Sequence, residues 1–576
     1  MRAPEDRKSV DERLHERVFD RRTFIARAAL ATGAALVGLS IDIGGGDLGG
    51  EVGRPPGPPT SPSGPPNILT IIVDQLRAPV WMPPQFGPPA AMPNLAALRA
   101  RSVSFESHYT AANDCSPSRS VLLTGLYTHQ TGVMITGAGW LDPRFPTWGT
   151  LLRQLGYETA YYGKWHLNPN ERVPLEQYGF SGGTYPSPNG SPGQGTRVDP
   201  SIADQFIEWL DGNGGIEPWA TTVSFVNPHD IAWWYRFTER IEAEAAPPRR
   251  AIAPPPNYET PEQLVKKRKP KLQLALQATA ARSFGPVEFT GPVAPTWWTQ
   301  MMDTYLLLQG FVDVQIGRVL RALWSRPDIA ANTVIIFTSD HGEYCGSHGM
   351  RGKGASAYEE ATRVPLYVYD PRGLVTAATD VPRTQLTSSA DVVALHLTIA
   401  HGSDAWRKEP EYAHLAGRHD LAKISKDPAA RGRAWVLHAT DEDVTEFASR
   451  VYPYDAPRHV VALRTPRGKL ALYSHWRPGT MEPQARGQES EFYDYATKEG
   501  RMELSSQGAG SLRKDALRAT LEGQAIPDEL RAPLPTALHQ PQRAGLASYH
   551  AHERVEAIAV YDAHRREAPA PAPEPL

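Results

Sequence analysis

Short apolar runs alternate with longer amphipathic stretches along most of this 576-residue chain. Four of the runs are nearly continuous in apolar and β-prone residues, as expected for strands that are buried on both faces of a sheet. They cover residues 67–73, 158–162, 221–226 and 333–338. Helices are expected over residues 92–101, 118–124, 201–210, 301–324 and 390–400. This order of elements predicts an α/β protein whose parallel or mixed sheet is covered by helices.

Beyond about residue 410 the sequence has few residues with recognisable chemistry. Residues 459–464 and 469–473 flank the turn sequence Thr465-Pro466-Arg467-Gly468, and this arrangement predicts a β-hairpin. The C-terminal end predicts a helix followed by a proline-rich tail. Upstream, the basic run Lys266-Lys267-Arg268-Lys269 is expected on a solvated loop or helix face, as most such runs are.

The N-terminal end has the features of an export signal. Arg21-Arg22 precede a modest apolar run over residues 25–41, as in a twin-arginine (Tat) signal. The run is too short and too rich in small residues for a comfortable transmembrane helix. Residues 1–43 are therefore expected to direct the chain to the Tat translocase, and the Gly/Pro-rich residues 44–66 to form a linker. The alternative is an amphipathic or disordered arm.

Export would make the protein periplasmic or extracellular. No small-x-small cleavage site is obvious after the apolar run, so an uncleaved signal that tethers the protein to the membrane stays open. The net charge is only −3, which gives no field that favours nucleic acid as a partner. Two cysteines, Cys115 and Cys345, form at most one disulfide. The 54 Pro and 48 Gly indicate a loop-rich enzyme.

Side chains that can bind metals or transfer protons follow all four predicted strands. In an open α/β sheet, ligands bind beyond the carboxyl ends of the strands. The residues at these ends are Asp74 after the first strand, Lys164 and His166 after the second, His229 after the third, and Asp340 and His341 after the fourth. Each residue alone is weak evidence, but together they predict a single polar site.

Cys115 lies at the start of a predicted helix, after the Asn113-Asp114 loop. A helix N-terminus offers unpaired N–H groups and a favourable field for an anion. Three interpretations are open on this basis. The residue could be a buried structural thiol, a thiolate nucleophile activated by the helix end, or the precursor of a modified side chain.

The segment Cys115-Ser116-Pro117-Ser118-Arg119 matches the C-x-P-x-R signature of the sulfatase family, in which the cysteine is oxidised to formylglycine. Other segments between about Asn67 and Ser506 also resemble family motifs: 124–129 (TGLYTH), 163–167 (GKWHL), 339–343 (SDHGE), 352–354 (GKG), 363–366 (RVPL) and 491–494 (EFYD). The chain thus resembles a formylglycine-dependent sulfatase of the alkaline phosphatase superfamily. The resemblance implies a mixed sheet flanked by helices in a catalytic domain over residues 67–410, and a smaller antiparallel α+β subdomain with a tail over residues 411–576.

The resemblance also implies a chemistry: hydrolysis of aryl or alkyl sulfate esters by a hydrated formylglycine and a divalent metal. The implied catalytic residues are Cys115 as nucleophile precursor, Arg119, Lys164 and Lys353 as a clamp on the sulfate oxygens, His229 as acid and His166 as base. The implied metal ligands are Asp74, Gln75, modified Cys115, Asp340 and His341. Ca²⁺ suits such a carboxylate-rich set best, with Mg²⁺ or Mn²⁺ as alternatives. The implied partners are a small-molecule or carbohydrate sulfate ester and a formylglycine-generating enzyme.

Residue 75 departs from the family pattern. Many sulfatases have two consecutive aspartates where this chain has Asp74-Gln75, so the neutral amide either binds through its carbonyl oxygen or does not bind. The Asp-Gln and Asp-His pairs also resemble those of choline-sulfatases and phosphonate monoester hydrolases. A phosphonate monoester or phosphodiester hydrolase on the same scaffold is therefore an alternative. A non-catalytic anion-binding protein is another, if Cys115 is not oxidised.

Several other residues that can bind metals or ligands are expected to have a purely structural role. His129 and His348 fit no ligand pattern and are expected outside the metal site. Cys345 is expected to be a small buried hydrophobe without a disulfide. The aromatic residues at 233–235 and 297–298 are expected in the core, with a pocket wall for an aryl or cationic leaving group as the alternative.

Overall fold

The computed structural model describes residues 64–82, 88–137, 139–216, 218–234, 254–284, 294–354, 356–442, 455–477, 483–506, 514–515, 518 and 534–566. The predicted export signal and residues 44–63 of the predicted linker lie outside this part of the chain. None of the helices in the described segments is both long and apolar enough to span a membrane.

A six-stranded sheet forms the centre of the protein. Its strands lie in the order β2 (Val103–Phe105), β7 (Leu366–Tyr369), β6 (Thr333–Ser339), β1 (Asn67–Asp74), β5 (Trp219–Pro228) and β4 (Glu158–Gly163). The neighbours β6, β1, β5 and β4 are parallel, whereas β7 runs antiparallel to β6. The four strands predicted from the sequence are therefore confirmed, and their carboxyl ends share one edge of the sheet.

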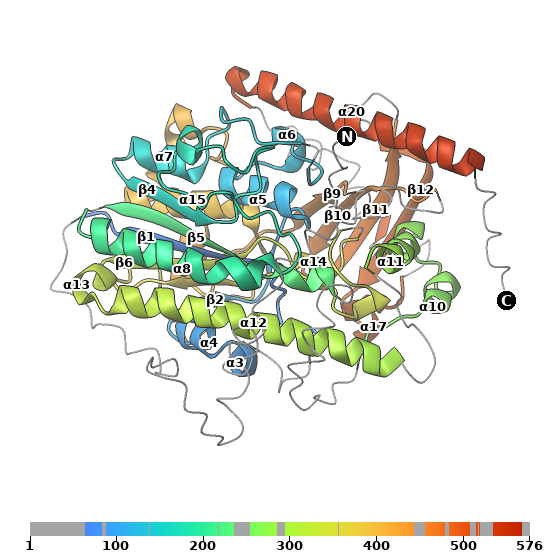
Figure 1. Cartoon of the computed structure of the whole chain (residues 1–576), viewed down its shortest axis with the longest axis horizontal. Coiled ribbons are helices and arrows are strands. Elements are labelled where there is room, and N and C mark those ends of the chain that lie inside the picture. The colour runs from blue at the N-terminus through green and yellow to red at the C-terminus, as the bar shows by residue number, and fades with distance from the viewer. Residues whose placement is uncertain are drawn as a thin grey trace, which may run out of the picture.

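Helices cover both faces of this sheet (Figure 1). One layer contains α4 (Pro93–Arg99), α8 (Gln194–Asn213) and α12 (Ala294–Trp324), and the other contains α5 (Cys115–Thr124), α7 (Trp148–Gln154) and α15 (Val392–His401). Alternate residues of β1 belong to the two cores: Leu69, Ile71 and Val73 to the first, Ile68 and Ile72 to the second. Burial of each such side chain stabilises the fold by roughly 1.5–3 kcal/mol, so both layers are held firmly to the sheet.

A second, antiparallel sheet follows in the order β12 (Pro483–Asp494), β11 (Gly468–Trp476), β10 (His459–Thr465) and β9 (Val436–Thr440). It confirms the predicted hairpin and the expected antiparallel C-terminal sheet. The predicted C-terminal helix is α20 (Thr536–Arg566), which packs against α6 (Thr128–Thr131) and extends toward the second sheet (Figure 1). Glycines make this close crossing possible, because a Cβ on Gly132 would lie 2.7 Å from Gly545 Cα.

Shorter elements complete the fold. β3 (His108–Tyr109) pairs with β8 (Thr387–Ser388). The other helices are α3 (Pro88–Ala91), α10 (Pro261–Lys266), α11 (Lys271–Phe284), α13 (Pro327–Ala331), α14 (Glu359–Thr362), α16 (Leu421–Lys426) and α17 (Lys498–Arg501). Single 3₁₀ turns are η2 (Leu175–Tyr178), η3 (His229–Trp233), η4 (Ser347–Gly349), η5 (Ser389–Asp391), η6 (Ala405–Lys408) and η7 (Pro410–Tyr412).

The structure corrects two expectations. The helices α8 and α12 begin before their predicted starts, and in α8 the polar first turns hide the apolar period. The prediction of a fully solvated basic run was wrong for Lys269, which is buried. Its ammonium lies 3.6 Å from Glu259 and donates to the hydroxyls of Tyr358 and Tyr493 at 3.0 and 2.6 Å. A buried carboxylate needs such a countercharge, and the local sequence does not show it.

Candidate active site

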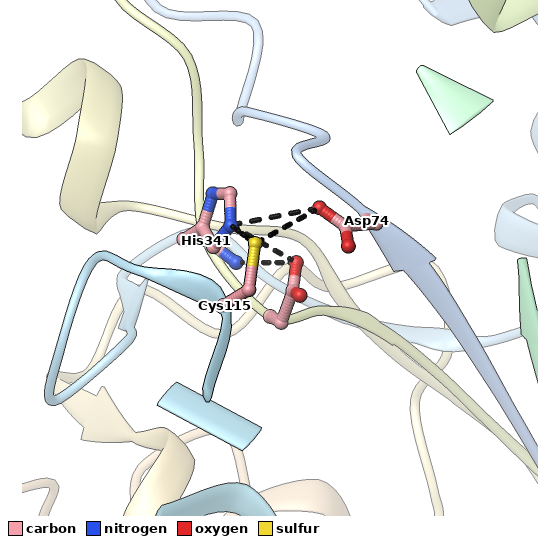
Figure 2. Close-up of side chains that lie close together, drawn as sticks. Asp74, Cys115 and His341 are labelled. Carbon is pink, nitrogen blue, oxygen red and sulfur yellow. Dashed lines mark hydrogen bonds and ion pairs between the residues drawn. The ribbon is translucent and has the colours of Figure 1, made fainter. Parts of the chain in front are cut away.

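The carboxyl ends of β1, β4, β5 and β6 meet in one buried polar site. Asp74 ends β1, Lys164 and His166 follow β4, His229 follows β5, and Asp340 and His341 follow β6. Cys115 enters from α5 as its first residue, and its sulfur points toward Asp74 and His341 (Figure 2). The edge of the sheet therefore brings together the residue types that the sequence placed at the strand ends.

Four of these side chains surround a position that suits a cation. Asp74, Cys115, Asp340 and His341 each place one potential ligand atom within 4.8 Å of the others, and all four are buried. Cys115 Sγ lies 3.3 Å from His341 Nε2 and 3.9 Å from Asp74 Oδ1 (Figure 2). Two carboxylates and an imidazole fit a hard divalent ion such as Ca²⁺, Mg²⁺ or Mn²⁺.

Hydrogen bonding prepares His341 for metal binding. Its Nδ1 lies 3.0 Å from the carbonyl oxygen of Gly342 and must donate, since a carbonyl only accepts. In the neutral ring, Nε2 then presents its lone pair to Asp74 and Cys115. Burial acts to lower the pKa of His341, but Asp340 and Cys115 raise it to about 9. A cation that binds here would therefore displace a proton from Nε2.

Arg119 balances the carboxylates. It lies four residues after Cys115, so the helix places both side chains on the same face. One guanidinium nitrogen lies 3.1 Å from Asp74 Oδ2 and 2.9 Å from Asp340 Oδ2. The other donates to the carbonyl oxygen of Lys164 at 2.6 Å and to Ser224 Oγ at 3.0 Å. These contacts favour a role for Arg119 in holding both carboxylates in place.

Lys164 adds positive charge next to the cysteine. Its Nζ lies 2.6 Å from Asp74 Oδ2 and 3.5 Å from Cys115 Sγ. Burial acts to raise the pKa of the Cys115 thiol, but Lys164 and Lys353 bring it well below its ordinary value. Burial likewise acts to raise the pKa of Asp74, yet nearby cations, Lys164 foremost, keep that carboxyl ionised. The site thus stabilises an anion at position 115.

Gln75 lies beside these groups, and both the oxygen and the nitrogen of its side-chain amide form hydrogen bonds. Its Oε1 accepts a hydrogen bond from Lys353 Nζ at 2.9 Å, and its Nε2 donates to Glu343. The Tyr305 hydroxyl donates to the main-chain oxygen of Gln75 at 2.7 Å. Lys353 Nζ also lies 3.1 Å from His229 Nε2. The main-chain N–H of Gln75 donates to Asp340 Oδ1 at 3.1 Å, so Gln75 borders the cation position, and its role as a ligand stays a prediction.

Comparison with known protein families identifies the family of this chain. The sequence profile named Sulfatase matches residues 66–402, more than half of the chain. The chain belongs to the sulfatase family. It is 29% identical over 339 residues to the uncharacterized sulfatase YidJ of Escherichia coli (strain K12), and 27% identical over 350 residues to the choline-sulfatase of Rhizobium meliloti (strain 1021). Each match covers 54% of this chain and 63% of the relative.

Solved structures show the same fold. A 2-O GAG sulfatase, BT1596, superposes with a TM-score of 0.59 at 20% identity, covering 81% of this chain and 91% of that chain. The phosphonate monoester hydrolase of Silicibacter pomeroyi superposes with a TM-score of 0.56 at 20% identity, covering 82% of this chain and 97% of that chain. The mixed α/β architecture expected from the resemblance is thereby confirmed.

In this sulfatase-family site, His166 lines a cavity of about 100 Å³. The cavity is also lined by Trp140, Asn168 and Glu171. The His166 carbonyl oxygen accepts a hydrogen bond from Ser116 Oγ at 2.7 Å, which fixes its backbone in the left-handed region at φ +59°. Burial lowers the pKa of the imidazole, so the ring is neutral and able to accept a proton.

Sequence reasoning missed Asp114. It is buried immediately before Cys115, and its Oδ2 accepts a hydrogen bond from Thr440 Oγ1 on β9 at 3.1 Å. Burial is the main cause that raises the pKa of Asp114 to about 7. Its place next to the signature cysteine could have identified it. Thr440 lies in a segment without a motif, and only the tertiary fold brings it here.

The histidines, the second cysteine and the aromatic residues that were expected outside the metal site lie outside it. His129 and His348 are buried outside the group around Asp74. Cys345 is a free thiol in the main core, and burial raises its pKa. Trp234, Trp297 and Trp298 belong to the same core, with Trp234 and Trp297 ring centroids 4.6 Å apart. Trp233 is buried too, whereas Tyr235 lies outside the described residues.

The position of Arg119 predicts a large stability effect. Arg119→Gln leaves Asp74 and Asp340 without their shared cation, so we expect metal-free protein to lose about 3–5 kcal/mol in the free energy of unfolding. Arg144→Gln is the control, because the Arg144–Asp142 pair lies at the surface, with side chains 49% and 26% exposed, and its loss should change the free energy of unfolding far less. Urea denaturation followed by circular dichroism measures both values. Equal losses in the two variants would contradict the proposed charge balance.

Proposed function

We propose that the protein hydrolyses sulfate esters, with a formylglycine made from Cys115 as nucleophile and with a divalent cation, Ca²⁺ in first place. The position of Cys115 carries this proposal. It is the first residue of a buried helix, with its sulfur 3.3 Å from His341 Nε2 and 3.5 Å from Lys164 Nζ. After oxidation, an oxygen at this position would join Asp74, Asp340 and His341 around the cation. Gln75 would be a further, neutral ligand.

The chain's own residues can bind the substrate and transfer the protons. When bound, the cation would lower the pKa of a hydroxyl at position 115 and offset the charge of the sulfate group. Lys164 and Lys353 would bind the sulfate oxygens, while Arg119 keeps the carboxylates in place. His229 would donate a proton to the leaving oxygen, since it lies at the strand end next to Lys353. His166, the neutral imidazole, would accept a proton as sulfate is released.

The substrate is proposed to be a small-molecule or carbohydrate sulfate ester. The names of two similar proteins, a choline-sulfatase and a 2-O GAG sulfatase, cover these two classes. The cavity beside His166 lies where part of such an alcohol could bind. Oxidation of Cys115 would require a formylglycine-generating enzyme as a partner during maturation.

Phosphonate monoester or phosphodiester hydrolysis is the second candidate. The Asp74-Gln75 pair keeps it open, because this pair resembles that of phosphonate monoester hydrolases as well as that of choline-sulfatases. The fold shared with a phosphonate monoester hydrolase is compatible with this activity. The charged groups around Cys115 would bind either tetrahedral anion.

Export is a separate proposal, based on Arg21-Arg22 and the apolar run over residues 25–41. The Tat translocase would carry the folded enzyme to the periplasm or beyond, with the signal removed or kept as an anchor. Residues 67–410 would form the exported catalytic domain, and residues 411–576 the C-terminal subdomain and tail.

Replacement of the nucleophile tests the main proposal. Cys115→Ala should reduce kcat on an aryl sulfate by roughly 10³-fold or more, because the covalent step is lost. Cys345→Ala is the matched control, since it also removes a buried thiol but should retain activity. Mass spectrometry of the Cys115 peptide from active enzyme should show an aldehyde. Full turnover by Cys115→Ala would overturn the mechanism, and an intact thiol in inactive native enzyme would favour an anion-binding role.

Paired assays separate the two hydrolase activities. We expect kcat/KM to be greater for an aryl sulfate than for an aryl phosphonate monoester with the same leaving group. The ratio of the two kcat/KM values is the quantity to measure, because it compares the two transition states directly. A greater value for the phosphonate would reject sulfate ester hydrolysis as the main activity in favour of the second candidate.

A reporter fusion tests export. Residues 1–66 fused to a reporter that acts only outside the cytoplasm should give activity, and the double change Arg21→Lys and Arg22→Lys should abolish it. Changing Arg7→Lys and Lys8→Arg in the same segment is the control, because these residues lie outside the twin-arginine pair. Undiminished export by the twin-lysine variant would argue against the Tat route.

A further inference from the structure

A second group of potential metal ligands lies apart from Asp74. His129 comes from α6, Asp441 directly follows β9, and His459 begins β10. Each places one potential ligand atom within 4.8 Å of the other two, and all three residues are buried. His459 Nδ1 lies 2.8 Å from Asp441 Oδ1, and His129 Nε2 lies 3.6 Å from Asp441 Oδ2. The proposed hydrolysis uses none of these residues.

Two facing atoms of this group have no hydrogen-bond partner among the residues that the structure describes: His129 Nε2 and Asp441 Oδ2. Their side chains are 10% and 1% exposed. A separation of 3.6 Å is too long for a hydrogen bond, and an unsatisfied buried polar group costs about 1–3 kcal/mol. Two ligands of one tetrahedral ion, with bonds of about 2.0–2.2 Å, lie roughly 3.3–3.6 Å apart. The spacing therefore suits two atoms that share a metal ion.

Neighbouring groups orient the ligands for an ion. Trp476 Nε1 donates to Asp441 Oδ1 at 2.7 Å and so fixes the plane of the carboxylate. Thr128 Oγ1 lies 3.2 Å from His129 Nδ1 and can accept a hydrogen bond from its N–H, which leaves the lone pair on Nε2.

We propose that His129, Asp441 and His459 form a second metal site, which takes Zn²⁺. Two imidazoles and one carboxylate are typical zinc ligands, whereas the group around Asp74 is richer in carboxylate oxygens and favours harder ions. His459 would bind through Nδ1: the ion would replace the proton of its 2.8 Å hydrogen bond to Asp441 Oδ1, and the two side chains would separate to the spacing of zinc ligands. The ion would link α6 to β9 and β10, and so join the helical layer to the C-terminal sheet.

The position of this site gives it a structural consequence. Thr440 immediately precedes Asp441 and hydrogen-bonds Asp114, the residue before Cys115. An ion at Asp441 would therefore fix the strand end that contacts the proposed nucleophile segment. The site requires neither oxidation of Cys115 nor a bound substrate, so it can be tested independently of the proposed hydrolysis.

Zinc binding by full-length protein tests the proposal. The parent is Asp340→Asn, which weakens the proposed cation site around Asp74; it is stripped with a chelator and dialysed against limiting Zn²⁺, and zinc is measured by mass spectrometry. We expect about one zinc per chain. Asp441→Asn and His459→Gln should each weaken binding by roughly 10- to 100-fold or more. His438→Gln is the matched control, a buried histidine of β9 whose Nδ1 donates to the carbonyl oxygen of Thr110.

Two further measurements make the result decisive. Zinc should raise the melting temperature of the parent and of the control, but not that of the two ligand variants. Absence of zinc uptake by the parent, or uptake by folded ligand variants equal to that of the control, overturns the proposal. If both variants fail to fold, Co²⁺ added to the parent decides. Absorption typical of a four-coordinate ion supports the site, and a spectrum like that of aqueous Co²⁺ rejects it.

Discussion

The ion pairs of Arg119 with Asp74 and Asp340 are the interaction on which the rest of the site depends. Two buried carboxylates close together would repel one another, and one of them would take up a proton. The guanidinium between them offsets that repulsion, and Lys164 adds a second positive charge 2.6 Å from Asp74 Oδ2. It also joins the ends of β1 and β6 to α5, so a single side chain fixes the relative positions of three elements.

The first turn of α5 shows why the signature residues have their spacing. Cys115 and Arg119 lie on one helix face, where Ser118 Oγ also donates to the carbonyl oxygen of Asp340 at 2.6 Å. Pro117 is the third residue of the helix, where its missing N–H costs little because the first N–H groups have no intrahelical acceptor. One turn thus supplies a nucleophile precursor, an anchor to β6 and a counter-ion.

Sequence reasoning succeeded where local pattern and physics agree. The four buried strands were visible as continuous apolar runs, and the rule that ligands bind at carboxyl ends placed Asp74, His229 and His341 together. It failed where distant segments meet without a motif. Lys269 is buried because Glu259 and two tyrosines surround it, and Asp114 depends on Thr440, which lies on the other sheet. His129 was correctly kept out of the first site, but its partners Asp441 and His459 come from a region without recognisable chemistry.

Burial of Cys115 constrains the order of events in the proposed maturation. The side chain is fully buried beneath contacts from α5, β6 and, through Asp114, the C-terminal sheet. An oxidising enzyme has to bind the chain segment around Cys115, and it could do so only before these layers close. Oxidation would therefore precede folding, and folding would precede any transport through a route that carries folded proteins.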